Sequence, residues 1–133
     1  PEKILALQVE LGELANETRC FKYWSNKPSS PKTVILEEYV DCLHFILSIG
    51  LTAGTKEELY EAQPPTVSTV TEQFRLLFSQ LESFIQKPEY DEYRKLMEAL
   101  LTLGVMLGFS EEEVVAAYLR KNEINHQRQD EGY

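Results

Sequence analysis

Two pairs of acidic residues have the spacing expected of metal ligands on helices. Glu10 and Glu13 are three residues apart, and so are Glu38 and Asp41. In a helix this spacing places both carboxylates of a pair on one face, about one turn apart. Apolar residues flank each pair, so neither pair lies in a fully solvated stripe.

The two pairs can share a cation if their helices pack side by side in opposite directions. Four carboxylates would then converge, and their repulsion in a partly buried site would be prohibitive without a cation. Sites built only from carboxylate oxygens suit Mg²⁺ or Mn²⁺. The alternative is that each pair is an ordinary solvated acidic face, and spacing alone does not decide between the two.

A cationic face near the end of the chain could bind phosphate. Lys121, Asn125 and Arg128 are spaced by four and three residues, so they share one side of a helix. Lys and Arg neutralise phosphate and Asn donates hydrogen bonds to it. Together with a carboxylate-bound cation, such a face could hold a polyphosphate. The alternative is that basic residues collect at a helix C-terminus because of the helix dipole.

The segment "CFKYWSNK" gathers aromatic and basic side chains after the first acidic pair. Trp24 could stack on a nucleobase and Lys22 could reach phosphate, although packing in the core is the more common role of a single Trp. His44 follows Asp41 by one helical turn and could hydrogen-bond a ligand or serve as a core histidine.

Helical periodicity dominates the chain and predicts an all-α bundle. The expected helices cover residues 2–24, 31–51, 67–86, 89–107 and 110–126, with one short turn near residues 56–61. Ser30 is expected to cap the second helix with Pro31 at its first position. Ser110 and Glu113 have the spacing of a capping box at the start of the fifth helix.

Composition narrows the possible functions. The chain has 133 residues and a net charge of −9, which disfavours a nucleic-acid backbone as partner. No apolar run approaches the roughly 18 residues of a membrane span. Cys20 and Cys42 fall within expected helices and are predicted to be free thiols in a reducing cytoplasm.

Three segments together resemble the dimeric dUTP pyrophosphatases, a branch of the all-α nucleoside triphosphate pyrophosphatases related to MazG. They are "VELGELANETRCFKYW", "ILEEYVDCLHF" and "KNEINHQRQDEGY". The resemblance implies hydrolysis of dUTP and dUDP by water attack on the β-phosphorus, with dUMP and pyrophosphate as the products from dUTP. It also implies a homodimer in which each site draws on both subunits.

The resemblance assigns roles to particular residues. Mg²⁺ ligands are expected at Glu10, Glu13, Glu38 and Asp41, with either Glu10 or Glu13 positioning the attacking water. Phosphate contacts are expected from Lys22, Lys121, Asn125, Arg128 and Tyr133. Trp24 and His44 are expected around the uracil and deoxyribose.

The resemblance implies a further N-terminal helix that reads the uracil, and residues 1–133 are expected to form a single domain that lacks this helix. Two alternatives therefore stay open: a pyrophosphatase of the same fold for dCTP or a modified nucleotide, and a non-catalytic helical dimer. The dimer interface is expected on the apolar face of the third and fourth helices, at Phe74, Leu77, Leu81 and Leu100.

Overall fold

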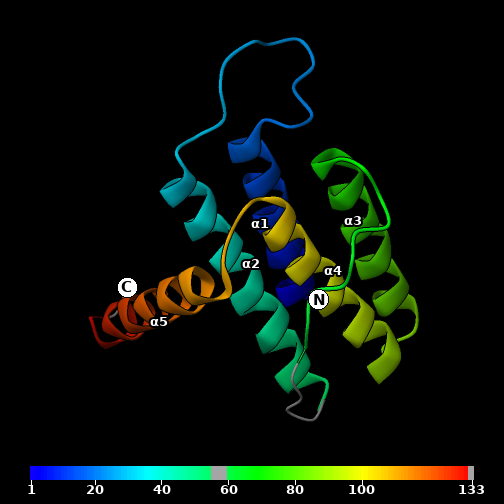
Figure 1. Ribbon diagram of the computed structural model, residues 1–133. Helices are drawn as coiled ribbons and strands as arrows, with labels where there is room; N and C mark the ends of the chain where they lie inside the picture. Colours follow the sequence, from blue (N-terminus) through cyan, green and yellow to red (C-terminus); the bar gives the residue numbers. More distant parts are fainter. Residues whose placement is uncertain (55–59, 132–133) are drawn as a thin grey trace.

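The computed structural model describes residues 1–54 and 60–131, with the side chains of residues 125, 126, 129 and 130 left out. These residues form five helices and no strand: α1 (Glu2–Thr18), α2 (Lys32–Thr52), α3 (Val70–Gln86), α4 (Tyr90–Met106) and α5 (Glu111–Asp130) (Figure 1). The prediction of an all-α bundle is confirmed. Within this part of the chain, no helix has the length and apolar character needed to cross a membrane.

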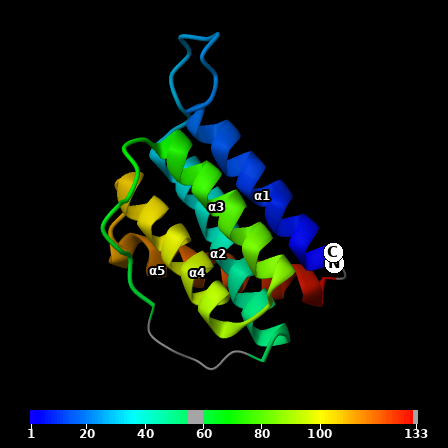
Figure 2. The same ribbon diagram turned by 90° about the vertical axis from the view of Figure 1, so that its right-hand side faces the viewer.

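Two antiparallel hairpins make the bundle (Figures 1 and 2). In the first, Lys3 Nζ at the start of α1 donates to Thr52 Oγ1 at the end of α2, at 2.7 Å. At the other end of the hairpin, the Ser30 amide donates to the Glu17 carbonyl oxygen at 3.0 Å. These two contacts fix the register, so the middle of α1 lies opposite the first half of α2. The second hairpin is α3 and α4, and α5 packs across α2.

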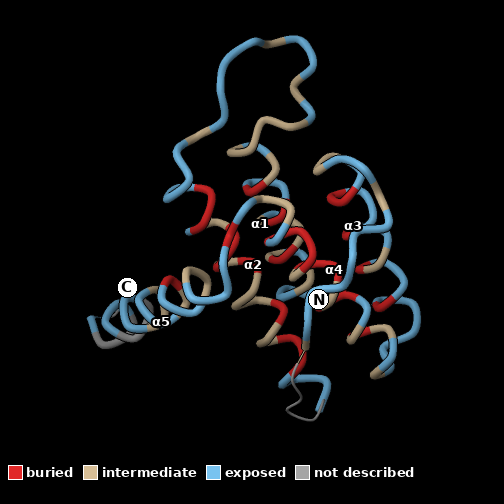
Figure 3. Tube along the Cα trace, in the orientation of Figure 1, coloured by how far each residue is buried: buried red, intermediate tan, exposed pale blue. Residues whose placement is uncertain are grey.

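The core lies between the two hairpins, and Figure 3 marks the buried positions along the helices. Leu7, Leu11 and Leu14 of α1 are completely buried. The residues expected at a dimer interface are also in this core, with exposed fractions of 4% for Phe74 and 0% for Leu77, Leu81 and Leu100. Placing the interface there was therefore wrong, because this apolar face is already covered within one chain.

The first helix ends six residues earlier than its apolar pattern predicts, at Thr18 instead of Trp24. Arg19 adopts a left-handed conformation with φ of 58°, and its amide donates to Ala15 and Asn16. The Thr18 hydroxyl donates to the Ala15 carbonyl and accepts from the Cys20 amide. Side chains that bond nearby backbone groups compete with helix continuation, and a left-handed residue ends the helix.

The second helix begins one residue later than expected, with Pro31 at the N-cap. Ser30 does not cap it, because the Ser30 hydroxyl donates to the Glu17 carboxylate of α1 instead. A contact to a distant helix thus replaces the local one that the Ser-Pro pair predicted.

The starts of α3 and α5 follow local capping chemistry. α3 begins after Thr69, whose hydroxyl accepts from the Glu72 amide at 3.1 Å, and not at Val67. The predicted capping box at the start of α5 is confirmed, because the Ser110 hydroxyl accepts from the Glu113 amide at 3.1 Å. α5 continues to Asp130, four residues beyond its predicted end. The short turn expected near residues 56–61 falls largely outside the described residues.

Close packing between α2 and α4 depends on a glycine. The Tyr39 hydroxyl donates to the Leu100 carbonyl at 2.9 Å, and Tyr39 is 1% exposed. A Cβ atom on Gly104 would lie 2.5 Å from the Tyr39 hydroxyl oxygen and 2.7 Å from Cζ. Only a residue without a side chain fits beside this buried ring.

Gly104→Ala is therefore expected to destabilise the protein by about 1–3 kcal/mol, since overpacking outweighs the better helix propensity of Ala. Gly12→Ala is the matched control, because a Cβ there meets nothing within 4 Å. The control should gain about 0.5–1 kcal/mol. Urea unfolding of both variants measures the difference, and equal stability gains would contradict the described packing.

Candidate metal and nucleotide site

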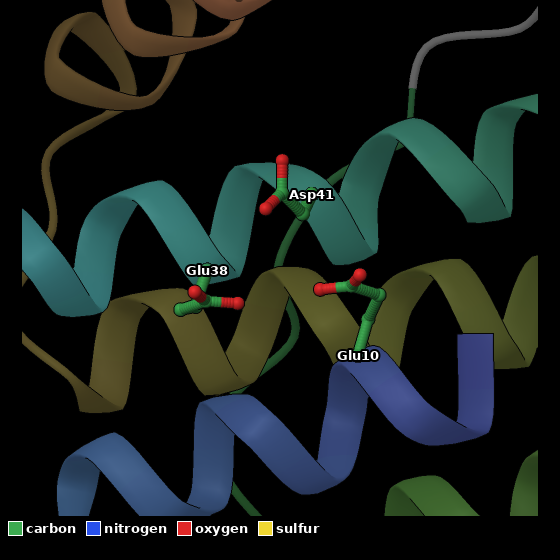
Figure 4. A group of neighbouring side chains, drawn as sticks. All are labelled: Glu10, Glu38 and Asp41. Carbon is green, nitrogen blue, oxygen red and sulfur yellow. The ribbon is translucent and has the colours of Figure 1, made fainter. Parts of the chain in front are cut away.

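Three carboxylates meet between α1 and α2. Glu10, Glu38 and Asp41 each offer an oxygen, and these oxygens lie within 4.8 Å of one another. Figure 4 shows Glu10 rising from α1 toward Glu38 and Asp41 on the facing side of α2. The antiparallel packing expected from the two acidic pairs thus brings three of the four predicted ligands together.

The fourth predicted ligand, Glu13, lies at the edge of this cluster. Its side chain is exposed, and it is outside the group of three. It is nevertheless close enough for its charge to raise the pKa of both Glu10 and Glu38. The four acidic residues therefore form one electrostatic unit with three tightly grouped members.

The cluster is electrostatically strained without a cation. Burial, followed by the charges of Glu13, Asp41 and Glu38, raises the pKa of Glu10 to about 7. Burial and the charge of Asp41 raise the pKa of Glu38. One buried oxygen each of Glu10 and Glu38 has no hydrogen-bond partner. Buried carboxylate oxygens without donors are costly unless a cation or a proton binds them.

The donor set fits a hard divalent cation. All the ligands are carboxylate oxygens, as Mg²⁺ and Mn²⁺ prefer, and two of them are buried without donors. Only modest side-chain movement is needed to bring oxygens within 4.8 Å of one another onto a single ion.

α5 brings a lysine to the cluster. Lys121 Nζ lies 3.5 Å from Asp41 Oδ1, and both side chains are largely buried, at 23% and 21% exposed. Burial raises the pKa of Asp41 while Lys121 opposes that shift. The sequence predicted the cationic face but not this contact with the acidic cluster.

The rest of the predicted phosphate face extends along α5 away from Lys121. Arg128 lies two turns further on and is exposed. Asn125 lies between them on the helix, but its side chain is outside the description, and Tyr133 lies outside the described residues altogether. Lys121 is thus the member of this group for which a contact with the carboxylate cluster is described.

The residues expected around the base occupy two different places. His44 is half-buried on α2, and its ring lies 6.1 Å from that of Tyr118 on α5. Trp24 and Lys22 belong to the loop that connects α1 and α2, which projects from the bundle (Figure 1). Trp24 is 64% exposed, and its ring contacts are with Phe21 and Tyr23.

An all-α bundle with a carboxylate cluster on antiparallel helices and an adjacent lysine is the architecture expected of the all-α nucleoside triphosphate pyrophosphatases. A family model described as dUTPase matches residues 1–133, and the chain belongs to this family. It is accordingly an enzyme that hydrolyses dUTP, a nucleotide substrate, with a divalent metal cofactor. No curated protein matches the chain.

Removing one charge from the cluster should stabilise the metal-free protein. The pKa of Glu10 is about 7 in the folded chain and 4.5 without the fold, so folding takes up a proton between these values. Stability is therefore lost as the pH rises through this window. Glu10→Gln should be more stable than wild type by about 1 kcal/mol above pH 7, once solvent screening is allowed for, and by almost nothing below pH 4.5.

Thermal melts in EDTA at pH 5 and pH 8 measure this effect, and a shift of roughly 3–5 °C is expected at pH 8. Glu37→Gln is the control, since Glu37 is exposed beside Glu38 on the same helix. If Glu10→Gln raises the melting temperature equally at pH 5 and pH 8, the described electrostatics are contradicted.

Proposed function

We propose that the chain catalyses Mg²⁺-dependent hydrolysis of dUTP to dUMP and pyrophosphate, and of dUDP to dUMP and phosphate, at the cluster between α1 and α2. One observation carries this proposal: three carboxylate oxygens lie within 4.8 Å of one another, and two buried carboxylate oxygens have no donor. Together with the dUTPase family match, this favours dUTP over the other nucleotides and over a non-catalytic role.

The metal would be held by the three grouped carboxylates of Glu10, Glu38 and Asp41. Glu13 is the fourth acidic residue and lies at the edge of this group. Bound Mg²⁺ supplies a Lewis acid that polarises the phosphate oxygens and lowers the pKa of a water molecule. We assign the positioning of the attacking water to Glu13, because its carboxylate lies outside the tight group and is exposed to incoming solvent. Its carboxylate oxygen would accept the proton of that water as the β-phosphorus is attacked.

Lys121 and Arg128 would neutralise the phosphates. The Lys121 ammonium lies beside Asp41, so a polyphosphate that reaches the cluster meets a cation there. Arg128 follows on the same face of α5 and can contact the phosphate that leaves. Asn125 and Tyr133 remain predicted phosphate contacts on the same segment.

Trp24 and Lys22 in the connecting loop, and His44 on α2, remain the predicted contacts to the base and sugar. Trp24 is exposed and can stack on a pyrimidine, and Lys22 follows Phe21 in the same loop. His44 lies one turn from Asp41 on α2 and is near enough to the cluster to meet the deoxyribose.

Glu38→Gln should reduce dUTP turnover by at least about 100-fold while the chain remains folded, because it removes one charged oxygen from the metal site. Glu37→Gln should retain near-normal activity, since Glu37 is exposed outside the cluster. The measurement is pyrophosphate release at several Mg²⁺ concentrations, with circular dichroism as the check on folding.

The same assay with dCTP, dTTP and UTP tests the substrate. The proposal expects dUTP to have the highest kcat/KM. If Glu38→Gln keeps ordinary activity at low Mg²⁺, the cluster does not take part in the reaction. A higher kcat/KM for another nucleotide would overturn the substrate assignment.

We further propose a homodimer, with an interface other than the one expected from the sequence. The outer face of α1 carries Leu5 and Val9, which are 62% and 51% exposed. These apolar residues lie opposite the buried leucines of α1. In a two-fold symmetric dimer the same surface of both copies forms the interface, so each copy would cover these residues of the other.

Val9→Asp should then dissociate the dimer, because it places a charge within an apolar interface. Val105→Asp is the matched control, since Val105 on α4 is 59% exposed and the same charge is introduced there. Sedimentation at micromolar concentration is expected to show dimers for wild type and the control and monomers for Val9→Asp. Monomeric wild type, or a dimeric Val9→Asp variant, would contradict the proposed interface.

A further inference from the structure

The loop between α1 and α2 is closed at its neck by a pair of residues. The Ser30 hydroxyl donates to the Glu17 carboxylate, and the Ser30 amide donates to the Glu17 carbonyl oxygen at 3.0 Å. Glu17 is the last acidic residue of α1, and both residues are half-buried. The loop that leaves α1 thus returns to the same helix turn before α2 begins.

Inside the neck, Arg19 links the two sides of the loop. Its guanidinium Nη2 donates to Ser25 Oγ at 2.8 Å, and its Nε donates to the Lys27 carbonyl at 3.3 Å. The Thr71 hydroxyl of α3 donates to the Cys20 carbonyl at 2.9 Å, which fixes one side of the neck to the bundle. On the other side, the bonds between Ser30 and Glu17 hold the chain just before α2, and Lys32 at the start of α2 lies 3.0 Å from the Glu113 carboxylate of α5.

The part beyond the neck is chemically distinct from the rest of the chain. Residues 18–29, between Glu17 and Ser30, contain three basic residues and no acidic one, although the whole chain has a net charge of −9. Phe21, Tyr23 and Trp24 are exposed by 40%, 93% and 64%. Their rings pack edge to face on one another, with Trp24 at 6.1 Å from Phe21 and 5.1 Å from Tyr23. Few apolar contacts therefore hold these side chains against the helices, and hydrogen bonds at the neck take over that role.

We propose that Glu17 is a positioning residue of the enzyme, which fixes the loop that carries Trp24 and Lys22 through its hydrogen bond to Ser30. Glu17 follows Glu13 by four residues, so it lies on the same side of α1 as the carboxylate cluster but is not part of it. Its carboxylate accepts from Ser30, and the neck of the loop is thereby set about two helical turns from Glu10 of the cluster. The inference rests on the proposed function, in which Trp24 and Lys22 contact the nucleotide.

Losing this bond should loosen the loop without moving the cluster. When the half-buried Glu17 carboxylate loses the Ser30 hydroxyl, or the hydroxyl loses the carboxylate, a charge-assisted hydrogen bond is lost. Binding contacts from the loop act on the ground state and the transition state alike, so their loss raises KM and leaves kcat unchanged. A residue that merely stabilised the fold would not give this pattern.

The test uses Trp24 as its own probe, because it is the single tryptophan of the chain. Its fluorescence anisotropy, measured without nucleotide, reports the rigidity of the loop. Glu17→Ala and Ser30→Ala should each lower this anisotropy and raise the KM for dUTP roughly three- to tenfold, with kcat changed less than about twofold. The double variant should be no worse than either single one, since both remove the same bond.

Two conservative variants and one control complete the design. Glu17→Gln keeps an acceptor oxygen and Ser30→Thr keeps the hydroxyl, so both should restore most of the anisotropy and the KM. Glu37→Ala, at an exposed acidic residue of α2, should change neither.

Unchanged anisotropy in Glu17→Ala would overturn the inference whatever the protein's substrate. Lower anisotropy with an unchanged KM would also overturn it, because the loop would then be held by Glu17 without contributing to nucleotide binding. If wild type fails to hydrolyse dUTP, the proposed function falls, and the anisotropy still decides whether Glu17 holds the loop.

Discussion

Repulsion among the carboxylates between α1 and α2 is the constraint on which the site depends. The packing of α1 forces the acidic residues together: Leu7, Leu11 and Leu14 are fully buried, so the side of the helix that carries Glu10 must face α2. Apolar burial of this kind contributes about 1.5–3 kcal/mol for each side chain, which is enough to hold like charges at close range. The fold thereby stores an unfavourable interaction that a bound divalent cation would relieve.

The positions of α5 and the connecting loop follow from the same arrangement. α5 packs on α2 and places the Lys121 ammonium 3.5 Å from Asp41, where it offsets part of the acidic charge. At the far end of α1, Glu17 is not in the cluster but binds Ser30 and closes the loop. Acidic residues on one face of α1 therefore have two roles. Glu10 belongs to the charged cluster, and Glu17 closes the connecting loop through its hydrogen bond.

The helices, the acidic spacing and the capping box could be predicted from the sequence because they depend on local residue patterns. The three-residue spacing that pairs Glu38 with Asp41, and the capping box at Ser110, are properties of single helices, and the structure has both. What could not be predicted depends on contacts between elements. The use of Ser30 by Glu17, in place of a local cap, arises only when the two helices are already packed. Apolar periodicity likewise shows which residues are buried, but not whether the same chain or a second copy covers them.

The most direct test of the central claim is calorimetric titration of the nucleotide-free protein with Mn²⁺ at pH 7 in two buffers of different ionisation enthalpy. The account predicts saturable binding accompanied by proton release, because the pKa of Glu10 near 7 leaves the cluster partly protonated until a cation arrives. It also predicts binding at least about tenfold weaker in Asp41→Asn. Absence of Mn²⁺ binding at millimolar concentration, or equal affinity in wild type and Asp41→Asn, would contradict the assignment of these carboxylates to a metal site.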